Sequence, residues 1–204
     1  IVEEQLKRIN SSLKLLGNKG EKAISLLHEA GRVRSAILLT SYTNRAVDEI
    51  CSMLSSAGID FLRIGSRFTC DPLYRDRLAE TVFSEDGSLE RVRRRIREVP
   101  VVVATTSTLM SHQEILLLKD FSLTIVDEAS QILEPDIIGL LARLGKFVMI
   151  GDYKQLPAVV QQSPLDSVVE ETVLKEIGLT DCRHSLFERL LSYVSEIPNC
   201  LGTL

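Results

Sequence analysis

The stretch LTIVDEASQILEPD, residues 123–136, sets a short apolar run directly against two adjacent acids, Asp127 and Glu128. An apolar run of this length is typical of a strand buried in a parallel sheet. In doubly wound sheets, ligands bind beyond the carboxyl ends of the strands. The stretch therefore predicts an α/β fold with a functional site where this strand ends.

Similar apolar runs recur along the chain and alternate with segments of helical spacing. We expect strands at 35–40, 59–65, 101–106, 123–129 and 146–152, and helices at 44–58, from 107 to about 118, and at 134–144, 165–177 and 184–195. Near-continuous apolar strands that alternate with helices favour a mainly parallel sheet with helices on both faces.

Two segments depart from this alternation. Residues 1–32 carry apolar side chains at helical spacing, which predicts a helical N-terminal segment. Residues 66–98 are rich in charge and poor in large apolar side chains, and they predict a surface insertion of two short helices, about 72–82 and 88–98. The run RVRRRIR, 91–97, fits either phosphate contacts or a solvated helix face.

Composition narrows the class of protein. The chain has 204 residues, 45% hydrophobic and 25% charged, with a net charge of −4, which is typical of one globular α/β domain with an insertion. No apolar run approaches the roughly 20 residues of a membrane span, so we expect no membrane partner. The four cysteines are far apart and form no C-x-x-C pair, which favours reduced thiols and a cytoplasmic protein, and argues against zinc.

Four expected strand ends carry polar residues. They are TSYTNRAVD at 40–48, ATTSTL at 104–109, DEAS at 127–130 and GDYKQLPAVV at 151–160. Each segment alone is a weak signal. Four such segments on neighbouring strand ends predict a single composite site, because parallel strands end at the same edge of their sheet.

The two acids and the glycine turn suggest phosphate chemistry. Asp127 at a strand end fits a Mg²⁺ beside a nucleotide, and Glu128 fits a group that polarises an attacking water. The alternative is that both acids cap the next turn. Gly151 gives its turn backbone freedom, and Gln155 could sense a phosphate or orient water. The alternative for that segment is a simple Gly-Asp turn.

The segments 40–48 and 104–109 place hydroxyls, and in the first case an amide, just before a helix. Such residues suit N-capping. They suit hydrogen bonds to phosphates equally well. Two such loops at adjacent strand ends fit the backbone of a nucleic acid.

In their order and spacing, the four segments resemble the motifs of superfamily 1 helicases, in particular the Upf1-like (DNA2/NAM7-type) group. SLFERL, 185–190, is similar to the segment that closes their first motor domain, and the resemblance covers about residues 33–195. It implies a RecA-like, P-loop NTPase-type motor domain at 33–204, with a nucleic-acid-contacting insertion at 66–98. It also implies an ATP-dependent DNA or RNA helicase that uses ATP and Mg²⁺ and partners single-stranded nucleic acid and a second RecA-like domain.

The resemblance also implies roles for single residues. Asp127 matches the Mg²⁺-associated acid, Glu128 the catalytic base and Gln155 the residue that couples the γ-phosphate to the nucleic acid. Gly151 and Asp152 belong to the same nucleotide-binding turn. The residues implied along the nucleic-acid track are Thr43, Asn44, Thr105, Thr106 and Ser107.

One expected motif is missing from these 204 residues. The phosphate-binding loop G-x-x-x-x-G-K-[ST] should precede the strand at 35–40, but Gly17, Gly20 and Lys22 have the wrong spacing. We therefore expect a fragment of an active helicase that does not hydrolyse ATP by itself. One alternative is a non-catalytic module that binds nucleic acid or a partner. Another is a different P-loop enzyme, against which the GDYKQLP turn after DEAS argues.

Overall fold

The computed structural model describes residues 36–86, 89–113, 115–152, 154, 158, 160–195, 197–198 and 200–202. The predicted helical segment 1–32 and the predicted coupling residue Gln155 lie outside these residues.

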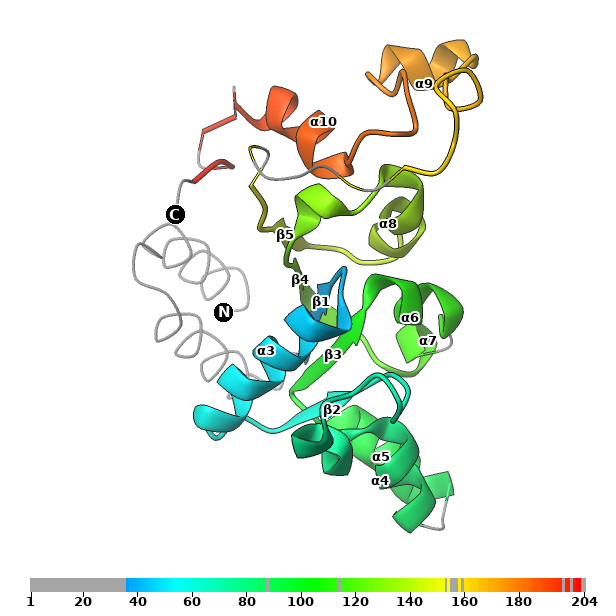
Figure 1. Ribbon diagram of the computed structural model, residues 1–204. Helices are drawn as coiled ribbons and strands as arrows, with labels where there is room; N and C mark the ends of the chain where they lie inside the picture. Colours follow the sequence, from blue (N-terminus) through cyan, green and yellow to red (C-terminus); the bar gives the residue numbers. More distant parts are fainter. Residues whose placement is uncertain are drawn as a thin grey trace.

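A five-stranded sheet in the order β2-β3-β1-β4-β5 forms the centre of the fold (Figure 1). The strands are β1 (Ala36–Ser41), β2 (Phe61–Arg63), β3 (Val101–Thr105), β4 (Phe121–Val126) and β5 (Phe147–Met149). All four strand pairs are parallel. The predicted α/β class with a mainly parallel sheet is confirmed.

Helix α3 (Asn44–Ser56) covers one face of the sheet. Its buried side chains recur at helical spacing and pack on the alternate residues of β1 and β3 that point to this face. This first cluster includes Val47, Ile50, Cys51 and Leu54 of the helix and Ile37, Leu39, Val101 and Val103 of the strands. Each fully buried aliphatic side chain contributes about 1.5–3 kcal/mol, so this face fixes the position of α3 firmly.

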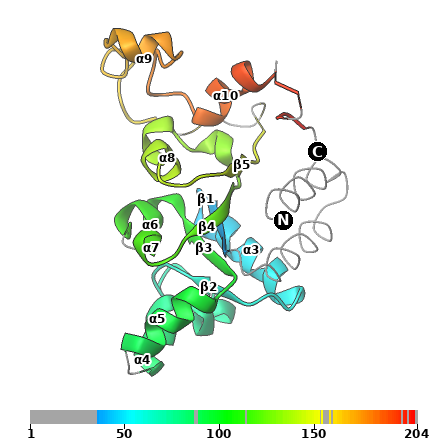
Figure 2. The same cartoon turned by 180° about the vertical axis from the view of Figure 1, so that it is seen from behind.

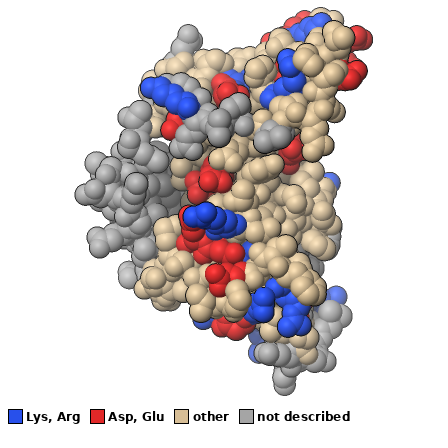
Figure 3. All heavy atoms as spheres, in the orientation of Figure 1, with Lys and Arg blue, Asp and Glu red and all other residues tan. Residues whose placement is uncertain are grey.

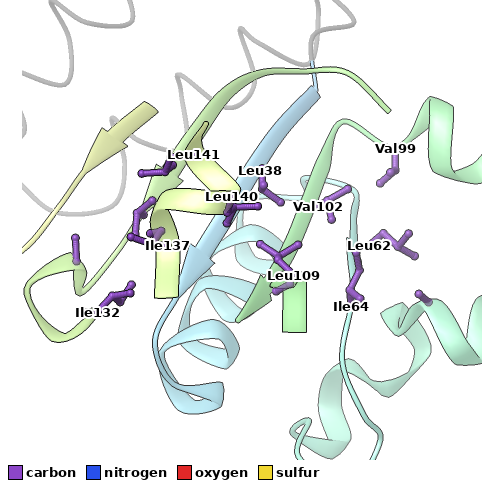
Figure 4. Packing of buried hydrophobic residues seen from close by; sticks show 14 of the residues in the cluster. Leu38, Leu62, Ile64, Val99, Val102, Leu109, Ile132, Ile137, Leu140 and Leu141 are labelled. Atoms are coloured by element: carbon purple, nitrogen blue, oxygen red, sulfur yellow. The ribbon is translucent and has the colours of Figure 1, made fainter. Parts of the chain in front are cut away.

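Helices α6 (Thr106–Ser111) and α8 (Glu134–Leu141) cover the opposite face, which Figure 2 shows from behind. Figure 4 shows the cluster on this side, where Leu109 of α6 and Ile137 and Leu140 of α8 pack on Leu38 and Val102. Helix α10 (Leu186–Val194) adds Leu186 to the cluster. The predicted coverage of both faces is therefore confirmed.

The described residues of the insertion form three helical pieces, where two were predicted. They are the 3-10 helix η1 (Pro72–Arg77), α4 (Ala79–Asp86) and α5 (Leu89–Glu98). A single helix over 72–82 is wrong because Leu78 is extended, fully buried and bridged to Arg63 of β2. Burial of one apolar side chain against the sheet edge thus interrupts the helix.

Charged side chains fasten the insertion to the sheet. Asp60 accepts hydrogen bonds from Arg95 at 2.8 Å and from Arg77 at 2.9 Å, and the bond from Arg95 lowers the pKa of Asp60. Lys119, which follows α7 (Ile115–Leu118), donates from Nζ to the carbonyls of Ile96 and Arg97 at 2.8 Å each. Burial lowers the pKa of Lys119 to about 8. These contacts hold α5 in place at both sides.

The C-terminal part is less helical than predicted. The expected helix 165–177 is reduced to α9 (Thr172–Glu176), because Val168 forms an antiparallel bridge with Asp181 and the Val169 N–H donates to the carbonyl of Thr180 at 3.0 Å. Helix α10 begins close to its predicted position, since Ser185 and Glu188 form a capping box. In the described part of the chain, no helix is long and apolar enough to cross a membrane.

Candidate functional site

The two predicted acids lie where β4 ends, between the ends of β1 and β5. The backbone N–H of Asp127 donates to the carbonyl of Thr40 at 2.8 Å, and that of Ala129 donates to Ile150 at 2.8 Å. The turn after β4 is therefore bonded to both neighbouring strand ends. Since β3 is parallel to β1 and Thr105 pairs with Ser41, all four predicted segments begin at one edge of the sheet, as the sequence indicated.

Glu128 adopts a left-handed backbone conformation, with φ 52° and ψ 36°. Among the described residues, it is the only non-glycine with a positive φ. A side chain in this region costs about 1–2 kcal/mol. The hydrogen bonds of Asp127 and Ala129 to the adjacent strands, on either side of Glu128, hold the strained residue in place. Strain of this kind is concentrated at functional sites.

Within the described residues, no cationic side chain contributes to the pKa shifts of Asp127 and Glu128. Burial raises the pKa of Asp127, opposed by a hydrogen bond from the Glu128 N–H to Asp127 Oδ1 at 3.0 Å. Burial also raises the pKa of Glu128, and the charges of Asp127 and Glu49 raise it further, while the Ser41 hydroxyl acts in the opposite direction. Within the described residues, Glu128 Oε2 is buried and accepts no hydrogen bond.

The capping alternative therefore holds for one acid and not for the other. Asp127 Oδ1 bonds the next backbone N–H and so stabilises the turn locally. Glu128 stands at the N-cap position of the 3-10 helix η2 (Ala129–Gln131), but its side chain caps nothing. A strained, half-buried carboxylate with a free oxygen has no structural task here, which leaves it available for a ligand or a water.

Glycine is required at position 151 because the backbone there packs closely against the DEAS turn and Phe187. The prediction that Gly151 provides backbone freedom is wrong. Its φ is not positive, unlike that of Gly58 or Gly178. A Cβ at this position would lie 2.9 Å from the backbone nitrogen of Ser130 and 3.3 Å from the ring of Phe187. The end of β5 therefore packs directly against the DEAS turn and α10.

Asp152, the next predicted residue, is exposed and accepts a hydrogen bond from the Lys154 N–H at 2.9 Å. The simple-turn alternative thus describes its local structure. Its role in nucleotide binding stays a prediction.

The hydroxyls of the two remaining segments act as N-caps. Thr43 accepts from the N–H of Ala46 at 3.1 Å at the start of α3, and Thr105 accepts from Thr108 at 3.2 Å at the start of α6. Thr105 and Thr106 are buried, whereas Ser107 is exposed. On this strand end, Ser107 is therefore the predicted track residue that a ligand can reach.

Sequence reasoning missed Arg63, which contacts the predicted track residue Asn44. Arg63 Nη2 donates to Asn44 Oδ1 at 3.2 Å, and Nη1 donates to Asp48. The available signal was a single charged residue inside the apolar strand FLRIG. A charge at that position must find a partner, because an unpaired buried charge is very costly.

Sequence reasoning also missed the contacts that fasten α10 to this edge. Arg189 donates to both carboxylate oxygens of the buried Glu134, from Nε at 2.7 Å and from Nη2, and also bonds the carbonyl of Ile177 at 2.8 Å. The sequence signal was the segment SLFERL, whose capping Ser185 precedes Arg189 by four residues. The pair explains why this segment packs beside DEAS.

Acidic side chains dominate the surface at this edge. Figure 3 shows them gathered over α3 and the strand ends beside it, with basic side chains between them. Glu49 lies here and is largely exposed, paired with Arg45 at 3.2 Å. Next to the uncompensated Asp127 and Glu128, this charge suits a ligand that brings its own cation.

Comparison with known proteins gives consistent matches. Residues 74–163 match the family model described as an AAA domain. The chain is 39% identical over 131 residues to the DNA replication ATP-dependent helicase/nuclease JHS1 of Arabidopsis thaliana, covering 63% of this chain and 9% of that protein. It is 34% identical over 157 residues to DNA2 of Gallus gallus, and 36% over 127 residues to DNA2 of Homo sapiens.

These two matches cover 76% and 61% of this chain, and 14% and 12% of the DNA2 proteins. The chain thus spans about a tenth of the length of the curated relatives it matches. The parallel sheet with its acidic strand end defines the class, a RecA-like motor domain of P-loop NTPase type. The matches support a motor-domain fragment of the superfamily 1, Upf1-like group that includes the DNA2-type proteins.

Proposed function

We propose that the chain forms the ATP-hydrolysing and strand-contacting edge of an ATP-dependent helicase. The observation that carries the proposal is Glu128, whose backbone is strained and whose buried carboxylate oxygen has no hydrogen-bond partner among the described residues. A general base needs such an oxygen, because it must accept a proton from water in the reaction. The relatives are named as ATP-dependent helicases, which supports the same reading.

The edge also fits a magnesium–nucleotide complex. In proteins, Mg²⁺ keeps several waters and takes one or two carboxylates together with the phosphates of its nucleotide. The described residues hold no group of three or more His, Cys, Asp and Glu side chains that could form a complete metal cage. Asp127, a carboxylate directly after the end of β4, fits the partial ligand set of Mg–ATP.

In the proposed reaction, each residue has a distinct task. Asp127 would hold the Mg²⁺, whose charge stabilises the negative charge that develops on the phosphates. Glu128 would orient the attacking water and accept its proton. Gln155 is proposed to relay the state of the terminal phosphate to the strand, although it lies outside the described residues.

The nucleic acid is proposed to cross the same edge at the starts of α3 and α6. Thr43, Asn44 and Ser107 are the predicted track residues that are not buried there, and the Thr43 hydroxyl is engaged as an N-cap. A second RecA-like domain is proposed to complete the nucleotide site from the other side, and a cytoplasmic location stays a prediction.

The 204 residues contain no G-x-x-x-x-G-K-[ST] loop. That loop supplies the backbone donors and the lysine that hold the β- and γ-phosphates. We therefore propose that turnover belongs to the full-length protein and that these residues alone do not hydrolyse ATP.

The test is Glu128→Gln in the full-length protein, measured as strand-stimulated ATP hydrolysis. The amide keeps the shape of the side chain but cannot accept the proton, so kcat should fall by about 10²–10⁴-fold with ATP binding retained. Glu170→Gln, the same change at an exposed position, is the matched control and should leave kcat unchanged. Unchanged turnover in Glu128→Gln would show that Glu128 is not the base.

The pH profile gives an independent check. The base works in its ionised form, and burial raises the pKa of Glu128 above its ordinary value of 4.5. As pH falls, kcat should therefore begin to decline above pH 4.5. A decline that follows the ordinary carboxylate value would contradict the buried environment seen here.

A further inference from the structure

Arg63 is a completely buried arginine at the end of β2. Its side chain has no exposed surface, yet its guanidinium reaches two acceptors on α3, Asp48 and Asn44. Burying a guanidinium costs several kcal/mol unless it is paired and hydrogen-bonded. The pairing therefore ties β2 rigidly to the first turns of α3.

The contact with Arg63 decides how the Asn44 carboxamide is oriented. A guanidinium has only donors, so the Asn44 atom that faces it must be the oxygen. The amide nitrogen is then directed away from Arg63. Since Asn44 is half-exposed, the group that it offers to a ligand is a donor NH₂.

Both acids of α3 are paired, Asp48 with Arg63 and Glu49 with Arg45, so they do not exclude an anionic ligand oxygen from Asn44. Asn44 is the first residue of the 13-residue helix α3, directly after the N-cap Thr43. The N-terminal end of a helix carries a partial positive charge. An outward NH₂ and this end of the helix together suit a phosphate oxygen, which accepts hydrogen bonds and donates none.

We propose that Arg63 is a positioning residue for the nucleic-acid track, which holds the Asn44 amide oxygen inward so that its NH₂ donates to a phosphate oxygen of the bound single strand. The inference rests on the proposed function, because it needs a strand at the start of α3. It adds a residue outside the signature segments. It also assigns position 44 a contact with the phosphate backbone, which is independent of base sequence.

Lysine cannot replace Arg63 in this task. The planar guanidinium bonds Asp48 through Nη1 and Asn44 through Nη2 at the same time. An ammonium is a compact point charge without that fork. Asp48 is further engaged by the backbone N–H of Asp71, which donates to its Oδ2 at 3.2 Å. A lysine drawn to Asp48 would leave the Asn44 amide free to turn over.

The first experiment measures single-strand affinity of the full-length protein carrying Asn44→Asp, with a fluorescent oligonucleotide. The carboxylate keeps an oxygen toward Arg63 and replaces the outward NH₂ by a second oxygen. Affinity should fall by about tenfold or more, because a like charge now faces the phosphate, while the melting temperature is retained. Ser52→Asp, which adds the same charge at an exposed position of α3, is the matched control.

The second experiment separates positioning from a general structural role by a double-mutant cycle. Arg63→Lys should weaken strand binding by about threefold to tenfold when Asn44 is present. In an Asn44→Ala background the same change should have no further effect on affinity. A merely structural role would instead lower affinity equally in both backgrounds.

The outcomes separate the inference from the proposed function. If the wild-type protein binds no single strand, both fail. If it binds, but Asn44→Asp binds equally well or the cycle shows no coupling, the inference fails and the proposed function stands. Weakened binding in Asn44→Asp, normal binding in Ser52→Asp and coupling between Arg63 and Asn44 would together support the inference.

Discussion

The edge that carries Asp127 and Glu128 and the edge that carries the insertion treat charge in opposite ways. At the insertion, Asp60 pairs with Arg77 and Arg95, and the buried Arg63 pairs with Asp48. At the acidic edge, burial raises the pKa of both carboxylates and one oxygen of Glu128 is left without a partner within the described residues. Paired charges hold the fold together, whereas the uncompensated charges mark the place where a ligand is expected.

The sharpest way to test the structural side of this contrast is to break the pair at Arg63. Arg63→Met should destabilise the full-length protein by about 3–5 kcal/mol, because Asp48 is left partly buried without its cation. Chemical denaturation measures the change. Arg93→Met, at an exposed position of α5, should change stability by no more than about 0.5 kcal/mol. Equal small effects of both changes would contradict the importance of pairing.

A smaller effect is expected where the two strand ends meet. Gly151→Ala places a Cβ 2.9 Å from the Ser130 nitrogen, and the resulting shift should cost about 1–3 kcal/mol. Because the displaced backbone belongs to the DEAS turn, ATP turnover should fall as well. Gly145→Ala is the matched control, since a Cβ there meets nothing within 4 Å. If both variants unfold at the same denaturant concentration, the close packing of these turns is refuted.

The smallest effect, with the opposite sign, is expected at Glu128. Glu128→Gly removes both the buried charge and the left-handed strain, and should stabilise the protein by about 1 kcal/mol while abolishing turnover. Glu128→Ala removes the carboxylate but retains a Cβ, so the difference in stability between the two variants reports the backbone strain. If the glycine variant is less stable than the alanine variant, the inferred backbone strain at position 128 is contradicted.

The free energy of unfolding of the wild-type protein should also depend on pH, because the pKa values of Asp127 and Glu128 are raised in the folded state. A carboxyl group whose folded pKa is raised binds its proton more readily when folded than when unfolded. The contribution of Asp127 and Glu128 to stability therefore falls as pH rises from their ordinary values, 3.8 and 4.5, through the raised ones. Asp60, whose pKa is lowered, contributes in the opposite sense and loses its contribution as pH falls.

Local sequence patterns predicted the sheet well, because β1, β2 and β3 are buried throughout and β1 and β3 read as continuous apolar runs. They failed where a contact from elsewhere decides the conformation. Leu78 breaks the expected helix 72–82 because it is buried beside β2. The helix expected at 165–177 is shorter because Val168 pairs with Asp181, and the Val169 N–H with the carbonyl of Thr180, in an antiparallel bridge.

The candidate site shows the same division. Order and spacing of the polar segments were enough to place Asp127 and Glu128 at a shared sheet edge with the start of α3. The Thr43 hydroxyl caps a helix, whereas Ser107 is exposed to a ligand. This difference depends on rotamer and burial, which cannot be inferred from the spacing of residues in the sequence. The partners of Arg63 lie 15 and 19 residues away and meet it only because β2 and α3 pack together.

The sequence by itself determined the parallel α/β fold, the helicase class and the acids at the end of β4, because periodic burial and motif order are written in neighbouring residues. The tertiary structure alone decided the strain at Glu128, the close approach that requires glycine at 151 and the orientation that Arg63 imposes on Asn44. Each of these results from two or more elements brought together by packing. Long-range contacts of that kind leave no periodic signal in the chain.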